Sequence, residues 1–169
     1  AGWSATQLQK LLEPDRTQVT DDAIPAAPTI PVTKLGDVWQ LGRHRLVCGD
    51  ARDAAVVALA LGGAQPFLMV TDPPYGTNYD PRWRNQLGLH DQESPRMGVV
   101  LNDHNASWPD VYKLFPGDVA YVWHSSLHIP IVAADIDACG FVRRSLIIWA
   151  KSRFAVSRCH YHWQHEPCW

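Results

Sequence analysis

Four consecutive residues, Asp72, Pro73, Pro74 and Tyr75, combine groups that can hold and orient an amine. The two prolines fix the backbone φ angles, so the carbonyls around them point in set directions. A carboxylate and a fixed carbonyl are both acceptors, and together they can receive both hydrogens of an amino group and aim its lone pair. Tyr75 adds a flat ring on which a heterocycle can stack. The alternative is a plain Pro-Pro turn capped by Asp72.

The apolar run that leads into this motif, residues 67–71, is short and continuous, which is typical of a strand buried on both faces. Further strands are expected at 119–123, at 142–150 and from His165 onward, and glycine-ended helices at 53–61 and 129–139. Strands alternating with helices predict an α/β sheet with parallel strands. Because such sheets place their sites beyond the carboxyl ends of strands, we expect residues 72–75 to form the functional site.

The other segments are expected to frame this sheet. Residues 38–41 and 45–48 predict a hairpin, and residues 108–115 a short helix capped by Ser107. Residues 77–105 lack periodicity and contain many turn formers, so we expect one long mobile loop that closes over a substrate. Residues 1–34 predict a short helix and a Pro-rich linker, which implies a domain fused upstream, and residues 35–169 form the main domain.

The composition of the chain limits its class. Its 169 residues, 46% apolar and 19% charged, fit one domain with a proper core. No apolar stretch is long enough to cross a membrane, and no signal peptide is visible. The net charge of −2 does not by itself suggest that the protein binds a polyanion such as nucleic acid. Residues 141–169, however, carry five basic residues and one acidic residue. This basic end is either a surface for a polyanion or a solvated face.

The four cysteines form no Cys-x-x-Cys pair, so we interpret them as reduced thiols of a cytoplasmic protein. The run 159–168 is rich in Cys and His, the residue types that bind zinc. In an extended segment, however, these side chains alternate between two faces, and we therefore expect no metal site.

Residues 72–75 resemble the catalytic motif of the DNA amino-methyltransferases, which methylate adenine N6 or cytosine N4 with S-adenosylmethionine. Four further segments resemble the surroundings of that motif in the family: residues 46–51, 114–123, 147–151 and 165–169. The resemblance covers about residues 35–169 and corresponds to the catalytic half of such an enzyme. The family's Phe-x-Gly-x-Gly motif for the cofactor is missing. We therefore expect a permuted arrangement, with that motif and the region that reads DNA sequence beyond Trp169.

The resemblance implies a Rossmann-like methyltransferase sheet with helices on both faces. Because Asp72 leads the motif, it implies methylation of adenine N6 in double-stranded DNA. The target base would be flipped from the duplex, stacked on Tyr75 and held through its amine by Asp72 and the Pro73 carbonyl. S-adenosylmethionine would contact Asp50, Ala51 and Asp72, with a helix-capping role as the alternative for Asp50. The protein would be a cytoplasmic, DNA-associated enzyme of bacterial or phage type.

Four basic residues are candidate contacts to DNA phosphates: Arg82, Arg84, Lys151 and Arg153. For the first two, solvated loop charges are the alternative. Three other functions stay open: a cytosine-N4 methyltransferase, an inactive DNA-binding remnant, and an RNA or protein-amide methyltransferase. Because apolar strand and helix faces would be left uncovered, we expect residues 1–169 alone to bind the cofactor weakly, to transfer no methyl group, and to dimerise or aggregate.

Overall fold

A computed structural model describes residues 28–80, 82, 99–154 and 160–169. The contacts of the chain divide it into two units, Ala1–Thr33 and Lys34–Trp169. Residues 28–33 of the first unit are exposed and contain no helix or strand. The short helix expected near Leu8, most of the Pro-rich linker and most of the long loop at 77–105 lie outside the described residues.

The second unit begins with a hairpin and a helix. Strands β1 (Val38–Leu41) and β2 (His44–Val47) pair antiparallel. Helix α2 (Ala54–Leu61) begins at Asp53, whose carboxylate accepts a hydrogen bond of 2.8 Å from the amide of Ala55. It ends at Gly62 in the left-handed conformation, as a residue without Cβ readily does. The hairpin and the helix predicted for this segment are thus confirmed.

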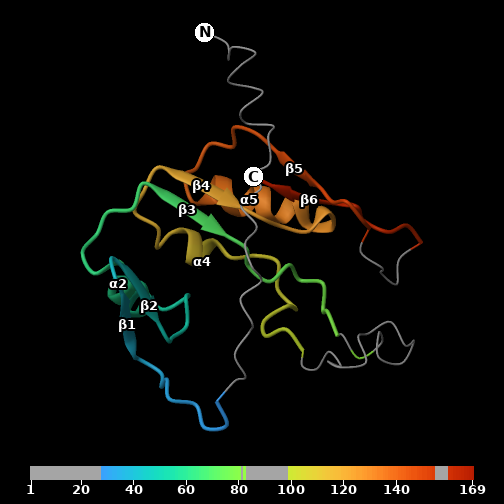
Figure 1. Ribbon diagram of the computed structural model, residues 1–169. Helices are drawn as coiled ribbons and strands as arrows, with labels where there is room; N and C mark the ends of the chain where they lie inside the picture. Colours follow the sequence, from blue (N-terminus) through green and yellow to red (C-terminus); the bar gives the residue numbers. More distant parts are fainter. Residues whose placement is uncertain (1–27, 81, 83–98, 155–159) are drawn as a thin grey trace, which may run out of the picture. The chain divides into compact units, whose positions relative to one another are not determined.

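A parallel pair of strands carries the candidate site. Strands β3 (Leu68–Thr71) and β4 (Val119–Val122) run side by side, with Thr71 opposite Val122 at their carboxyl ends. Strands β5 (Ile147–Ala150) and β6 (His165–Cys168) form an antiparallel pair. Two backbone hydrogen bonds between Val122 and Trp169, of 2.9 and 3.0 Å, and a bridge from Trp123 to Cys168 connect β4 to β6. The spatial order is therefore β3-β4-β6-β5 (Figure 1).

Two helices cover one face of these strands. Helix α4 (Pro109–Tyr112) and helix α5 (Ile129–Ala138), the latter preceded by a 3₁₀ turn (Ser126–His128), pack on the face that carries Ala120 and Val122. The buried cluster consists of Trp108, Tyr112, Val122, Val132 and Ile136. Burial of this apolar surface is the main force that holds the strands and helices together.

The opposite face of the strands is open among the described residues. Its side chains include Val70, which is 64% exposed, and Trp149, which is 53% exposed. The expected combination of helices and strands is confirmed, but the described strand pairs are mixed: β3 and β4 are parallel, and the other two pairs are antiparallel. The expected helices on both faces are not found in the described part of the chain, where α4 and α5 share one face. No described helix has the length and apolar character that a membrane crossing requires.

Three local predictions need correction. The strand expected at 142–150 is limited to Ile147–Ala150, and because no described helix separates it from β6, the two strands pair antiparallel rather than parallel. The helix expected at 108–115 is limited to Pro109–Tyr112. Ser107 does not cap it, because the Ser107 hydroxyl donates a hydrogen bond of 2.9 Å to Asp135 in α5.

Candidate functional site

The loop that contains Asp72, Pro73, Pro74 and Tyr75 starts directly at the carboxyl end of β3. The last residue of the strand, Thr71, accepts a backbone hydrogen bond of 3.0 Å from Trp123, so the loop leaves the sheet beside the end of β4. The side chain of Asp72 is exposed. The Tyr75 hydroxyl donates a hydrogen bond of 2.6 Å to Asp72 Oδ1.

The tyrosine of this loop is held in its protonated form. Burial raises the pKa of Tyr75 far above its usual value, and the hydrogen bond to Asp72 and the charge of Glu166 raise it further. A protonated phenol donates a hydrogen bond and does not act as a base. Tyr75 is therefore suited to binding and stacking, and Asp72 is the acceptor of the pair.

Two side chains fix the carbonyl groups of the loop. The Trp108 indole Nε1–H donates a hydrogen bond of 2.9 Å to the Pro74 carbonyl. The Tyr75 carbonyl lies 2.6 Å from His128 Nδ1, so in the Nδ1–H tautomer His128 donates to it. Among the described residues, no donor reaches the Pro73 carbonyl. The carboxylate of Asp72 and this open carbonyl are two neighbouring acceptors that the loop presents.

The backbone after the loop is tied to one buried carboxylate, Asp103. Its oxygens accept hydrogen bonds from the amides of Gly76, Thr77 and Tyr79 and from the Thr77 hydroxyl. Asp103, Trp108 and His128 were not predicted as site residues. Only the tertiary structure brings them to the loop, and no local spacing in the sequence marks them.

Charged and aromatic groups from β5 and β6 surround the same edge of the sheet. Lys151 forms an ion pair with Glu166, and its ammonium lies 5.0 Å from the centre of the Trp149 ring. Burial raises the pKa of the Cys168 thiol, and the negative charge of Asp72 raises it further. Glu166 and Cys168 of β6 are thus within electrostatic reach of Tyr75 and Asp72, respectively.

Two histidines near this edge, His124 and His165, contact neighbouring side chains of the fold. His165 Nε2 lies 3.0 Å from the Ser126 hydroxyl, which connects β6 to the turn before α5. His124 is 1% exposed and stacks on Trp169 with ring centres 6.2 Å apart. Burial lowers the pKa of His124, so the ring stays neutral near pH 7. These contacts fit packing roles rather than proton transfer.

The residues expected to contact the cofactor beside α2 are exposed. The Asp50 carboxylate pairs with Arg52 at 2.6 Å and also accepts the Arg52 amide. The hydrogen bonds from Arg52 lower the pKa of Asp50 to about 2. The alternative role of Asp50 as a helix cap is wrong, because Asp53 caps α2. Ala51 is exposed and lies in the turn before the helix.

The basic residues expected at DNA phosphates fall into different settings. Arg82 pairs with Asp80 at 2.6 Å, and Arg153 is exposed just after β5. Lys151 is half-buried and engaged with Glu166, so it is less available to a phosphate than its position after β5 suggests. Arg84 lies outside the described residues.

Within the described part of the chain, no group of three or more His, Cys, Asp or Glu side chains is arranged to hold a metal ion. Three cysteines in this part, Cys48, Cys139 and Cys168, are free thiols. Cys159, one end of the Cys- and His-rich run, lies outside the described residues.

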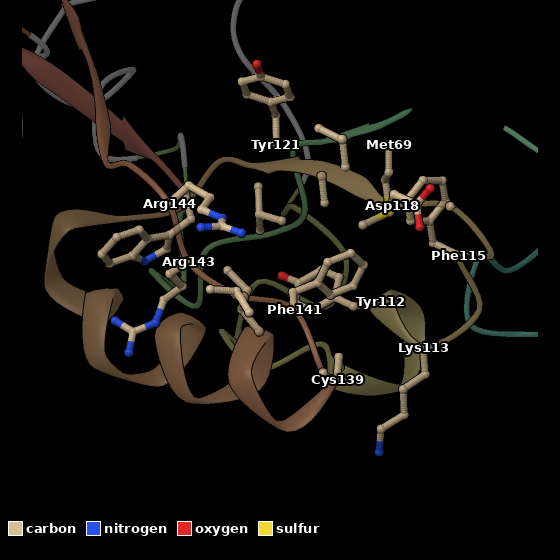
Figure 2. Close-up of a pocket in the computed structure, with 18 of the residues that line it drawn as sticks. Met69, Tyr112, Lys113, Phe115, Asp118, Tyr121, Cys139, Phe141, Arg143 and Arg144 are labelled. Carbon is tan, nitrogen blue, oxygen red and sulfur yellow. The ribbon is translucent and has the colours of Figure 1, made fainter. Parts of the chain in front are cut away.

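A cavity of about 950 Å³ lies away from this loop, where β4 begins. Its walls come from the end of α4 and the turn after it, from β4, and from the end of α5 and the segment after it. They include Tyr112, Phe115, Phe141, Arg143 and Arg144. Figure 2 shows Arg143 and Arg144 on one side of this view and Phe115 and Asp118 on the other. None of residues 72–75 lines it. The candidate loop at residues 72–75 is therefore separate from this cavity.

The site thus combines the exposed Asp72 carboxylate, the Pro73 carbonyl without a donor among the described residues, and Tyr75. Asp103, Trp108 and His128 fix the loop that carries them. Such a set can bind an amino group that donates two hydrogen bonds. Comparison of the chain with protein-family models, with curated proteins and with solved structures found no match.

Proposed function

We propose that this chain is the catalytic part of a DNA methyltransferase that transfers a methyl group from S-adenosylmethionine to adenine N6. The observation that carries the proposal is the Pro73 carbonyl, which has no donor among the described residues although side chains occupy the next two carbonyls. It lies next to the exposed carboxylate of Asp72. The chemistry of this pair and the resemblance of residues 72–75 to the family motif support the same reaction.

The two acceptors would act on the amine of a flipped base. One N–H donates to the Asp72 carboxylate and the other to the Pro73 carbonyl, which draws the nitrogen away from conjugation with the ring and exposes its lone pair. Orientation of this lone pair is where the loop lowers the barrier. After transfer, the nitrogen carries an extra proton, which leaves to the exposed Asp72 carboxylate or to water.

Tyr75 and the substrate amine would share the Asp72 carboxylate. The Tyr75 hydroxyl donates to Asp72 Oδ1 at 2.6 Å. Because a carboxylate has two oxygens and can accept several hydrogen bonds, the amine can donate to Asp72 while this bond is kept. The Tyr75 ring would then serve as a stacking surface for the base, with the Tyr75 carbonyl still bound to His128.

The cofactor would supply the electrophilic methyl group. Asp50 offers a carboxylate suited to hydroxyl donors such as those of a ribose. Its oxygens already accept hydrogen bonds from Arg52, so Asp50 can bind such a group by giving up part of this surface pairing. Exposed ion pairs are weak, and the exchange is therefore feasible. Asp72 would hold the amine beside the methyl donor.

The test is methyl transfer by the natural full-length protein from labelled S-adenosylmethionine to three substrates: duplex DNA, RNA and protein. The proposal expects label in duplex DNA, recovered as N6-methyladenine after digestion to nucleosides. Label recovered as N4-methylcytosine, or only in RNA or protein, would assign the loop to another amine or amide. Absence of transfer to all three substrates, by a folded protein that binds the cofactor, would refute the proposal.

A further inference from the structure

Asp103 accepts hydrogen bonds from the backbone amides of four consecutive residues, 76–79, which follow the Asp72–Tyr75 loop. Its Oδ1 accepts from the amides of Gly76 at 3.0 Å and Thr77 at 3.3 Å. Its Oδ2 accepts from the Thr77 hydroxyl at 2.9 Å and from the amide of Tyr79 at 2.7 Å. Its backbone carbonyl accepts from the amide of Asn78 at 2.8 Å. All four amides of residues 76–79 therefore bind one residue, 24 or more positions away.

The carboxylate of Asp103 is buried and has no cationic partner among the described residues. The residue is 4% exposed, and the ion pairs of this part of the chain do not include it. Burial alone would raise the pKa of Asp103, but the hydrogen bonds from Tyr79, Thr77 and Gly76 outweigh it and lower the pKa. The group is thus ionised, and hydrogen bonds to an ionised acceptor are about twice as strong as neutral ones.

The contacts of Asp103 continue a series of hydrogen bonds that fixes the backbone from Pro74 to Tyr79. Trp108 and His128 hold the carbonyls of Pro74 and Tyr75, and Asp103 holds the amides that come next. Gly76 makes the turn between these two groups at a φ of 73°, close against Ala106. Without the Asp103 contacts, only the hydrogen bonds from Trp108 and His128 would fix the loop within the described part of the chain. The Asp72 carboxylate and the Pro73 carbonyl would then be held less firmly in their position at the end of β3.

We propose that Asp103 is a positioning residue, which holds residues 76–79 so that the Asp72 carboxylate and the Pro73 carbonyl are set for the substrate amine. Asp103 does not contact the substrate and acts through the loop. The inference rests on the proposed function, because it assigns a purpose to the loop geometry.

The test uses the natural full-length protein and the variant Asp103→Asn. This change keeps the size of the side chain but removes its charge and one acceptor oxygen. Amide hydrogen exchange at residues 76–79, measured without substrate, is expected to accelerate at least about tenfold. For methyl transfer, kcat is expected to fall at least about tenfold, while the dissociation constant of the cofactor stays within about threefold. Asp118→Asn, an exposed residue at the start of β4, is the matched control and is expected to behave as the wild type.

A second variant guards against failure of Asp103→Asn to fold. Thr77→Val removes a single donor, the Thr77 hydroxyl, at an exposed position. It is expected to accelerate amide exchange at residues 76–79 and to lower kcat, each by less than Asp103→Asn does. Unchanged exchange in both variants would overturn the contact, and faster exchange with unchanged kcat would overturn the positioning role. Absence of transfer by the wild-type protein would overturn the proposed function instead. The exchange rates would still show whether Asp103 holds the loop.

Discussion

Replacement of Trp108 by Phe tests whether the candidate loop is fixed to the core. Trp108 is 7% exposed, belongs to the buried cluster and donates its indole hydrogen to the Pro74 carbonyl at 2.9 Å. Phe keeps the aromatic packing but offers no donor. The carbonyl then loses its partner, which costs about 1–3 kcal/mol. The deleted buried ring atoms add about 1–2 kcal/mol.

The expected loss in the free energy of unfolding is thus about 2–5 kcal/mol. For a domain of this size, that corresponds to a decrease in Tm of roughly 5–15 °C. Thermal and urea unfolding, followed by circular dichroism, measure both quantities. Trp39→Phe is the matched control: Trp39 is 42% exposed in β1, and its replacement is expected to change stability by no more than about 0.5 kcal/mol. If Trp108→Phe were no more destabilising than Trp39→Phe, the anchoring of the loop by Trp108 would be refuted.

Two further predictions concern the turn after the loop and the surface ion pair. Gly76→Ala places a Cβ 2.9 Å from that of Ala106 at a φ of +73°, whereas Gly140→Ala meets no atom within 4 Å at a φ of +85°. Both substitutions introduce backbone strain of roughly 1–2 kcal/mol. Because only Gly76→Ala also crowds Ala106, it is expected to be the more destabilising in urea unfolding, and equal losses in the free energy of unfolding would contradict the close contact. Arg52→Ala is expected to raise the pKa of Asp50 from about 2 toward 3.8 in a carboxyl NMR titration, because the hydrogen bonds from Arg52 are lost; an unchanged pKa would contradict the pairing.

The strands and longer helices were predictable because their signals are local. The apolar run at 67–71 and the glycines after residues 61 and 139 mark strand β3 and the ends of α2 and α5 within one or two residues. The strand at 142–150 was predicted too long. Its expected start at Val142 lies in an irregular segment at the cavity, and pairing with β6 begins only at Ile147.

The candidate site was predictable only in part. The types of residues 72–75 marked this loop as the candidate site, since a carboxylate, two prolines and a tyrosine stand next to one another, and amine binding by the loop stays a prediction. The groups that fix this loop come from elsewhere in the chain. Asp103 lies in a segment without periodicity, and the Trp108 indole looks like any apolar side chain in a sequence. Their partners are backbone atoms, which no sequence pattern specifies, and only the packing of α4 and α5 against β4 brings them near.

Methyl transfer to duplex DNA by Asp72→Ala in the natural full-length protein is the most direct test of the central claim, that Asp72 and the Pro73 carbonyl hold the substrate amine. Removal of the carboxylate deletes one of two acceptors for the amine, and transfer is expected to fall at least about a hundredfold. Cofactor affinity, measured by calorimetry, is expected to stay within a few-fold, because Asp72 acts mainly on the substrate amine and the other expected cofactor contacts, Asp50 and Ala51, are unchanged. Asp118→Ala is the control with unchanged transfer. Transfer at the wild-type rate by Asp72→Ala would contradict the account.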